Sequence, residues 1–232
     1  MFYMEQKNMR QILSLEELSL WMSIPKNESK DSIALRFKKI AEFLINKCSI
    51  EYRGTHYRFI DLEFYYFNDN HRDISTHPRQ SKALTWYIND FGGIDLNFES
   101  KIERVRIETK NKVSYKYRLT HDAFFGGILI RQIKELASGD ILDGPWKVAD
   151  LFRETDALSR YQDNPILIME NHKEETIIES TRLNLLGSCK TVEKKTSNNL
   201  CSYFCESHFD ESTLSSELNS FNNQKYRFTI NK

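Results

Sequence analysis

The stretch Tyr57-Arg58-Phe59-Ile60-Asp61-Leu62-Glu63-Phe64-Tyr65-Tyr66-Phe67 decides the fold class of this chain. Its aromatic and aliphatic residues are typical of a β-strand, and two carboxylates are embedded among them. A carboxylate in such surroundings is costly to bury unless it is paired or used, and its pKa rises toward the range of a general base. Strand alternation equally allows Glu63 to lie on a solvated face opposite Phe64, so both interpretations are open.

The segments around this strand predict a mixed α+β fold. A capping box at Ser14–Glu17 predicts a short helix through Met22, and a helical apolar stripe follows at Ile33, Phe37, Ile40 and Leu44, capped by Asp31 or Ser32. Gly144-Pro145 predicts another helix start. Strands are predicted at 50–53, 57–67, 85–88, 94–98, 124–133, 166–169, 176–178 and 226–230, with 166–169 and 176–178 pairing across 171–173 and 226–230 returning to the main sheet. The expected architecture is a single domain over residues 1–232, built around a curved, mostly antiparallel sheet with flanking helices.

Charge and composition exclude several classes of protein. The 232 residues carry 33 basic and 33 acidic side chains, so bulk charge alone cannot bind nucleic acid, although a local basic face can. No apolar stretch is long enough to span a membrane, and residues 1–11 lack the apolar region of a signal peptide. Four cysteines are too few for a disulfide scaffold. We therefore expect a cytoplasmic protein (in the nucleus, if the cell is eukaryotic) with no membrane partner.

Two segments stand apart from this domain. Residues of about 99–120 predict an exposed hairpin whose cations concentrate charge that the whole chain lacks, and we expect it to bind nucleic acid weakly and in a salt-sensitive way. The side chains assigned to this contact are Arg104, Arg106, Lys110, Lys112, Lys116 and Arg118. Residues of about 186–224 are rich in Ser and Asn and predict a loose segment rather than a second domain.

A few other residues could carry chemistry. Arg131 lies in an apolar run and requires an anionic partner, which is either a structural acid or a substrate phosphate. The glycine pairs 92–93 and 126–127 could admit a phosphate but match no nucleotide-binding motif. Cys201, Cys205 and His208 form an incomplete zinc-ligand set, so neither a metal nor a cofactor is expected.

The order of these motifs resembles that of the alkyladenine (methylpurine) DNA glycosylase family. The strand 57–65 looks like the family's G-R-I-V-E-T-E-A-Y strand, and the later segments follow in the family's order. They are Asp73-x-x-x-His77, Tyr87 with Asn97 ten residues on, 127–131 (like V-L-L-R), 144–148 (like G-P-x-K-L), 181–185 (like R-I-G-V) and 226–228 (like W-R-F).

The resemblance implies a glycosylase-like hydrolase of base excision repair that excises a flipped, modified base. Glu63 would activate water at the anomeric carbon, and Arg131 would assist by contacting a backbone phosphate. The base pocket would consist of Tyr65, His77, Tyr87 and Asn97, and Lys147 would lie at the nucleic-acid surface. DNA is the expected partner, with RNA or a nucleoside as the other choices. The fold would be similar to that of methylpurine DNA glycosylase.

Three departures from the family pattern bear on activity. Asp90 stands where the family has an intercalating tyrosine, and Phe91 could replace that wedge only if the loop shifts. The basic hairpin is an insertion between matched strands, and the chain is neutral where the family is usually basic. The alternative is a binding protein on the same fold that holds nucleic acid or a nucleoside without cleaving it.

Overall fold

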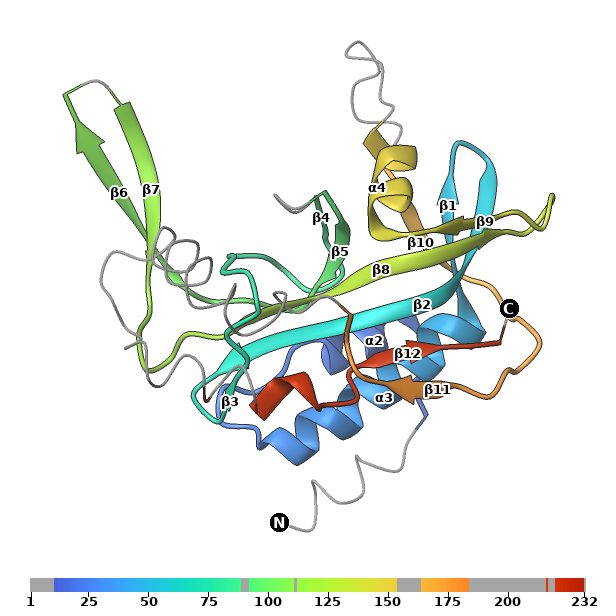
Figure 1. The fold of residues 1–232 in the computed structure, drawn as a ribbon, viewed down its shortest axis with the longest axis horizontal. Coiled ribbons are helices and arrows are strands. Elements are labelled where there is room, and N and C mark those ends of the chain that lie inside the picture. Colours follow the sequence, from blue (N-terminus) through green and yellow to red (C-terminus); the bar gives the residue numbers. More distant parts are fainter. Residues whose placement is uncertain are drawn as a thin grey trace.

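The computed structural model describes residues 11–88, 92–110, 112–153, 164–183, 216 and 220–231. The architecture is α+β, with a curled, antiparallel sheet and flanking helices (Figure 1). The helices are α2 (Leu15–Trp21), α3 (Lys30–Lys47) and α4 (Pro145–Arg153). The strands are β1 (Cys48–Tyr52), β2 (Thr55–Asn68), β3 (His71–Arg72), β4 (Trp86–Ile88), β5 (Ile94–Asn97), β6 (Glu103–Thr109), β7 (Lys112–Arg118), β8 (Phe125–Glu135), β9 (Ile141–Asp143), β10 (Ile166–Met169), β11 (Ile178–Ser180) and β12 (Arg227–Thr229).

Strand β2 is the centre of the sheet. The main path runs β10-β1-β2-β8-β5-β4, and β2 pairs with β8 along one edge. Its other edge pairs with β1, then with β12 at residues 61–63, and finally with β3. The return of the C-terminal strand to the sheet, predicted from residues 226–230, is thus confirmed.

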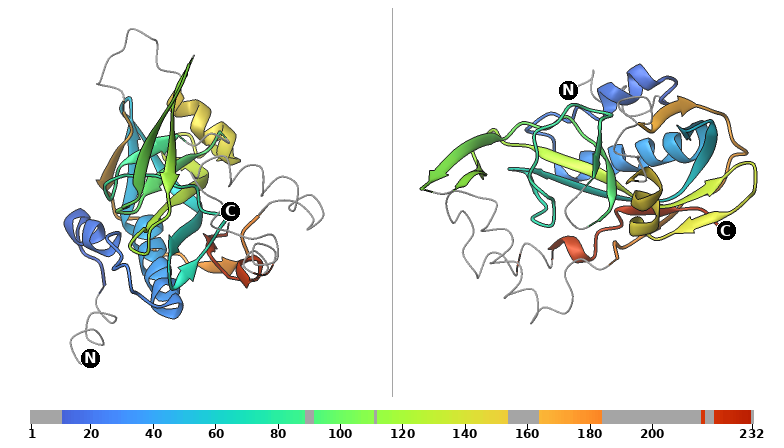
Figure 2. Two further views of the ribbon diagram at one scale, coloured as in Figure 1. Left: turned by 90° about the vertical axis from the view of Figure 1, so that its left-hand side faces the viewer. Right: turned by 90° about the horizontal axis from the view of Figure 1, so that it is seen from above.

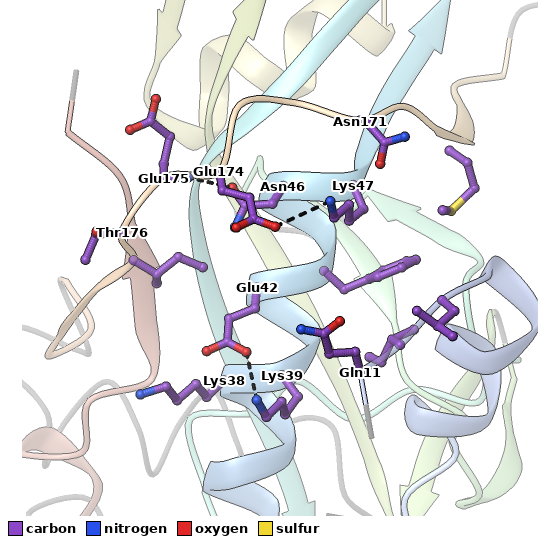
Figure 3. A pocket seen from close by; sticks show the side chains of 15 residues that line it. Gln11, Lys38, Lys39, Glu42, Asn46, Lys47, Asn171, Glu174, Glu175 and Thr176 are labelled. Carbon is purple, nitrogen blue, oxygen red and sulfur yellow. Dashed lines mark hydrogen bonds and ion pairs between the residues drawn. The ribbon is translucent and has the colours of Figure 1, made fainter. Parts of the chain in front are cut away.

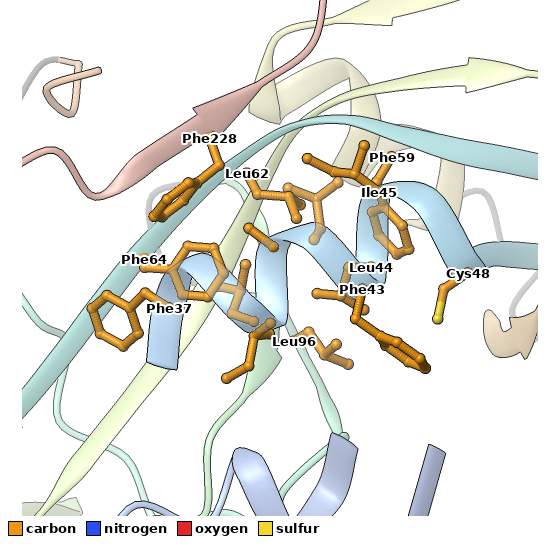
Figure 4. Close-up of a cluster of buried hydrophobic side chains, with 14 of the residues drawn as sticks. Phe37, Phe43, Leu44, Ile45, Cys48, Phe59, Leu62, Phe64, Leu96 and Phe228 are labelled. Atoms are coloured by element: carbon orange, nitrogen blue, oxygen red, sulfur yellow. The ribbon is translucent and has the colours of Figure 1, made fainter. Parts of the chain in front are cut away.

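The two faces of β2 differ in chemistry because side chains alternate along a strand. Leu62, Phe64 and Tyr66 are buried on the face covered by α3, where the ring of Phe37 lies 4.9 Å from that of Phe64 (Figure 4). Asp61 and Glu63 lie on the opposite face and are also buried. The wet-face alternative for Glu63 is therefore wrong, because the side chain has 0% exposure.

Helix α3 forms where the apolar stripe predicted it, but its cap is different. The helix begins at Lys30, and the hydroxyl oxygen of Ser29 accepts a hydrogen bond from the backbone N–H of Ser32 at 3.3 Å. The expected cap at Asp31 or Ser32 is wrong because those residues already lie in the first turn. A cap must precede that turn in extended geometry, which Ser29 adopts.

The predicted pairing of segments 166–169 and 176–178 is also wrong. Strand β10 pairs with β1, whereas β11 pairs with β12. The chain between them crosses the C-terminal end of α3, where Glu170 and His172 donate backbone hydrogen bonds to the carbonyls of Lys47 and Asn46. The two strands therefore join different partners of the sheet and form no hairpin with each other.

The basic segment forms its own two-stranded sheet, β6-β7. Figures 1 and 2 show this hairpin extending away from the body of the fold, on the side remote from α2 and α3. The Ser/Asn-rich segment lies almost wholly outside the described residues. Within the described part of the chain, no helix has the length and apolar character needed to cross a membrane.

Buried His71 makes stability depend on pH. Its Nδ1 lies 2.7 Å from the carbonyl of Tyr66 and its Nε2 3.0 Å from the hydroxyl of Tyr226, so the neutral ring donates at one nitrogen and accepts at the other. Burial lowers the pKa of His71 from 6.5 to about 4. The unfolded chain therefore binds a proton that the fold excludes between these two values.

We expect His71 to reduce stability as pH falls from 6.5 toward 4, by about 2–4 kcal/mol in total. Urea unfolding of the parent and of His71→Asn at several pH values measures this effect. The variant is less stable at pH 7 but has a flatter pH dependence in this window. Parallel curves for the two proteins would show that another group controls the acid sensitivity.

Candidate active site

Strand register brings four of the six predicted catalytic and base-pocket residues onto one face of the sheet. Glu63 pairs with Leu129, Leu129 with Asp95, and Asp95 with Tyr87, forming a row across β2, β8, β5 and β4. The next row joins Tyr65, Gly127 and Asn97. Directly paired residues point to the same side of an antiparallel sheet. Glu63, Tyr65, Tyr87 and Asn97 therefore share the face opposite α3.

Both carboxylate oxygens of Glu63 have partners. The hydroxyl of Tyr65 donates to Oε1 at 2.5 Å, and the guanidinium of Arg131 donates to Oε2 at 2.8 Å. Arg131 thus has an internal acid as the anionic partner that its apolar surroundings require, and its side chain is 13% exposed. The pair connects neighbouring strands β2 and β8, since Arg131 follows directly after the residue paired with Leu62.

Burial raises the pKa of Glu63, and the charges of Arg131 and Arg182, the hydroxyl of Tyr65 and the backbone of Leu183 oppose that rise. Burial and the negative charge of Glu63 together hold the pKa of Tyr65 well above its usual range. The phenol therefore remains a hydrogen-bond donor. A raised pKa and a fixed orientation are two of the properties expected of a general base.

A second ion pair lies against Tyr65. Arg182 donates to Asp73 at 2.5 and 3.2 Å and to the carbonyl of Phe64 at 3.2 Å. Its guanidinium carbon lies 4.7 Å from the centre of the Tyr65 ring. Arg182 and Asp73 are both fully buried and together connect residues 109 positions apart. The motif resemblance includes both residues, yet the sequence alone assigned neither a role in the site.

A third ion pair lies at the far end of the face. Arg79 donates to Asp95 at 2.7 Å and to the side-chain oxygen of Asn97 at 3.0 Å, and its guanidinium stacks 4.4 Å from the centre of the Tyr87 ring. Gly127 provides the necessary space, since a Cβ there would lie 2.9 Å from the Arg79 guanidinium. The glycine admits a guanidinium of the protein itself rather than the phosphate considered from the sequence.

The remaining predicted residues are placed as follows. The ring of His77 is half-buried, and its centre lies 6.5 Å from that of the Tyr87 ring. The side-chain amide nitrogen of Asn97 donates a hydrogen bond to the hydroxyl of Thr85 at 3.0 Å. Lys147 is exposed on α4, which lies across the sheet from α3 (Figures 1 and 2). Asp90 and Phe91, the wedge positions, lie outside the described residues.

The basic residues assigned to nucleic-acid contact are on the β6-β7 hairpin, apart from the Glu63 face. Strand β6 carries Arg104 and Arg106, and β7 carries Lys112, Lys116 and Arg118. Two of these cations have acidic partners within the hairpin, Arg118 with Glu103 at 2.7 Å and Arg106 with Glu108 at 2.5 Å. Lys110 is exposed at the turn.

Four buried acid–arginine pairs define what we call the ionic layer. They are Asp61–Arg227, Glu63–Arg131, Asp73–Arg182 and Asp95–Arg79. Each acid is at most 5% exposed at its side chain, and each is matched by one guanidinium. Buried ion pairs contribute little net stability because desolvation offsets their attraction. Net stabilisation alone is therefore a weak reason for the residues of the ionic layer.

A pocket of about 640 Å³ lies elsewhere, between residues 11–13, α3 and the 169–177 segment (Figure 3). Its lining includes no residue of the Glu63 face. Lys39 pairs with Glu42 at 3.1 Å and Lys47 with Glu174 at 3.6 Å, so these lining charges neutralise each other. The pocket therefore lacks the concentrated charge that would select an ionic ligand.

No group of three or more His, Cys, Asp or Glu side chains able to hold a metal occurs in the described parts of the chain. Cys201, Cys205 and His208 lie outside those parts. The prediction that these three residues bind no metal therefore stays a prediction.

Comparison with known proteins indicates no activity for this chain. No protein-family model matches it. The chain is 29% identical over 121 residues to an uncharacterized protein, L759, of Acanthamoeba polyphaga mimivirus, a match that covers 47% of this chain and 52% of that protein. The chain thus spans about half the length of the curated relative. That name states no activity, so the geometry of the Glu63 face carries the functional argument.

The Glu63–Arg131 pair generates a stability prediction. Arg131→Gln leaves a buried carboxylate without its nearest cation, and we expect a loss of about 3–5 kcal/mol at pH 8. The loss shrinks toward pH 5, because removing Arg131 raises the pKa of Glu63 further and the carboxyl group then accepts a proton. Denaturant unfolding at the two pH values measures both effects.

Two controls separate this effect from general damage. Arg118→Gln removes an exposed ion pair with Glu103 and should cost less than about 1 kcal/mol at either pH. The double variant Glu63→Gln/Arg131→Gln should recover part of the loss at pH 8, because no buried charge remains unpaired. A pH-independent loss with no recovery in the double variant would contradict the charge-pairing account.

Proposed function

We propose that this protein is an N-glycosyl hydrolase that removes a modified base from nucleic acid, on a fold similar to that of the alkyladenine DNA glycosylases. The observation that carries the proposal is the buried Glu63, oriented by Tyr65 and Arg131 on the same sheet face as Tyr87. In the proposed mechanism, the carboxylate takes a proton from water as the oxygen attacks the anomeric carbon and the C–N glycosidic bond breaks. The base leaves with the bonding electron pair and takes up the proton that Glu63 removed from water. The negative charge of Glu63 also stabilises the oxocarbenium-like transition state.

Tyr65, His77, Tyr87 and Asn97 are the proposed contacts of the extruded base. Aromatic rings bind any base by stacking, and a polar side chain at its edge discriminates between bases. Arg182 and Arg79 already lie against the Tyr65 and Tyr87 rings, respectively. A base would therefore stack on the ring faces that the two guanidinium groups leave uncovered.

The charge balance of the ionic layer supports a neutral base as the substrate. Each acid on this face has one arginine partner, so the layer carries no excess negative charge that would favour a cationic alkylpurine. We therefore propose a neutral modified base, deaminated or bulky, as the preferred leaving group.

The second candidate function is binding without cleavage. It is favoured by one observation: both oxygens of Glu63 are already hydrogen-bonded, which is also how a structural carboxylate is held. In this case the face would hold a nucleoside or a nucleic-acid base, with DNA as the first partner to test and RNA as the second.

Replacing Glu63 distinguishes the two functions. Glu63→Gln keeps the size and hydrogen-bonding edge of the side chain but cannot accept a proton, so base release should fall about a hundredfold or more while binding persists. The assay measures abasic sites in oligonucleotides that carry alkylated, deaminated or bulky bases. Asp61→Asn is the matched control, because it breaks another buried ion pair of the same face without removing the proposed base.

Release by the parent and by Asp61→Asn, but not by Glu63→Gln, supports the hydrolase. Equal release by all three proteins excludes Glu63 as the base. Binding by the parent with no release from any substrate supports the binding protein instead.

Base release should also depend on pH through Glu63. The ionised carboxylate is the active form, so the rate rises with pH through a pKa above the ordinary 4.5 of glutamate. Arg131 lowers that pKa, so Arg131→Gln should move the rising limb to higher pH. Single-turnover rates from pH 4.5 to 9 measure the shift. If the rate rises at the same pH in both proteins, a group other than Glu63 controls the pH dependence.

A further inference from the structure

The two faces of the β6-β7 hairpin differ in the side chains that they carry. The register pairs Arg104 with Tyr117 and Arg106 with Tyr115, which places two arginines and two tyrosines on one face. We call these four residues the Arg–Tyr face. The guanidinium of Arg104 lies 3.9 Å from the centre of the Tyr115 ring. Val105, Lys116 and Ile107 occupy the opposite face and are half-buried.

The Arg–Tyr face is open to a partner. Tyr115 is 50% exposed, and both Arg104 and Arg106 are exposed, although Arg106 also forms a solvent-exposed ion pair with Glu108 on this face. A two-stranded hairpin has no core of its own and is marginally stable in water, so the exposed ring of Tyr115 at its surface requires another explanation than packing. The hairpin also projects away from the body, where a long ligand can reach it without meeting the main sheet (Figures 1 and 2).

Charge selects the kind of partner. Residues 101–118 contain seven of the 33 basic residues and two of the 33 acidic ones, so this segment has five excess positive charges. The rest of the neutral chain consequently has five excess negative charges. A polyanion is attracted to the hairpin and repelled by the remainder, which limits the contact to a narrow strip of the ligand.

We infer that the Arg–Tyr face binds a single strand of nucleic acid, with bases stacked on the tyrosines and phosphates at the arginines. Stacking on an exposed ring requires a base whose faces are free, as in a single strand but not within a duplex. The combination of arginine with tyrosine, rather than lysine alone, is the side-chain chemistry that recognises both bases and backbone. The contact between the Arg104 guanidinium and the Tyr115 ring is already formed in the protein.

This inference deepens the proposed function, and it rests on the nucleic-acid substrate proposed there. A single strand presents bases that are already unpaired, so an enzyme acting on it needs no intercalating wedge. Asp90 then creates no difficulty at the position where the glycosylase family has a tyrosine. The hairpin would supply the strand affinity that the acidic remainder of the chain lacks.

Binding of labelled twelve-nucleotide oligo-dT and oligo-U strands, compared with a duplex of the same length, tests the inference by fluorescence anisotropy. The variants are Tyr115→Leu and Arg104→Gln on the Arg–Tyr face. Lys116→Gln is the matched control, because it removes one positive charge from the opposite face of the same hairpin. Circular dichroism of each variant verifies that the fold persists.

We expect either single strand to bind more tightly than the duplex. Tyr115→Leu should weaken strand binding about fivefold or more at every salt concentration, since stacking does not involve counterions. Arg104→Gln should weaken it at least as much and also reduce the slope of log affinity against log salt by about 0.7. Lys116→Gln should have less than half the effect of Arg104→Gln on the logarithm of affinity.

Tighter binding of the duplex, or equal losses in Arg104→Gln and Lys116→Gln with none in Tyr115→Leu, would overturn the inference. The assay is independent of catalysis, so it can be repeated in the Glu63→Gln background. Strand binding by the parent protein without base release from any substrate would contradict the hydrolase and leave the hairpin assignment standing. Base release without strand binding at the hairpin would support the hydrolase and contradict the hairpin assignment.

Discussion

The desolvation of two carboxylates on one strand constrains the rest of this structure. Strand β2 carries Asp61 and Glu63 into the interior, where an unpaired negative charge would cost several kcal/mol. The strands on either side provide the compensating cations, Arg227 from β12 and Arg131 from β8. Pairing of β2 with both neighbours is therefore required by charge as well as by backbone hydrogen bonds.

The same strand separates the structure into two chemically distinct sides. On the α3 side, aromatic rings such as Phe37, Phe64 and Phe98 pack within 4.9–6.3 Å of one another. On the other side, the ionic layer replaces hydrophobic packing with directional contacts. Apolar packing tolerates substitutions of similar volume, whereas a buried ion pair loses several kcal/mol when one member is removed. This contrast explains why we place the chemistry on the polar side and the stability on the apolar side.

The proposed activity and the hairpin inference concern separate parts of the molecule. Glu63 is completely buried, whereas the Arg–Tyr face is exposed on a sheet of its own. Chemistry requires a desolvated carboxylate, and capture of a polyanion requires accessible cations. Dividing the two proposed tasks in this way would allow the chain to remain neutral overall while it keeps a strongly basic hairpin.

Local sequence patterns determined the elements of this fold. The helical stripe from Ile33 to Leu44 produced α3, alternation in residues 57–67 produced the two faces of β2, and the basic residues around Lys110 produced the exposed hairpin. These patterns suffice because each depends on neighbours within one turn or one strand. The tertiary structure alone decided that Glu63 meets Arg131, 68 residues away, that Asp73 meets Arg182, 109 residues away, and that β10 and β11 join different strands. Periodicity contains no information about such distant partners, because they are selected by the cost of leaving a buried charge or a strand edge unpaired once the sheet has assembled.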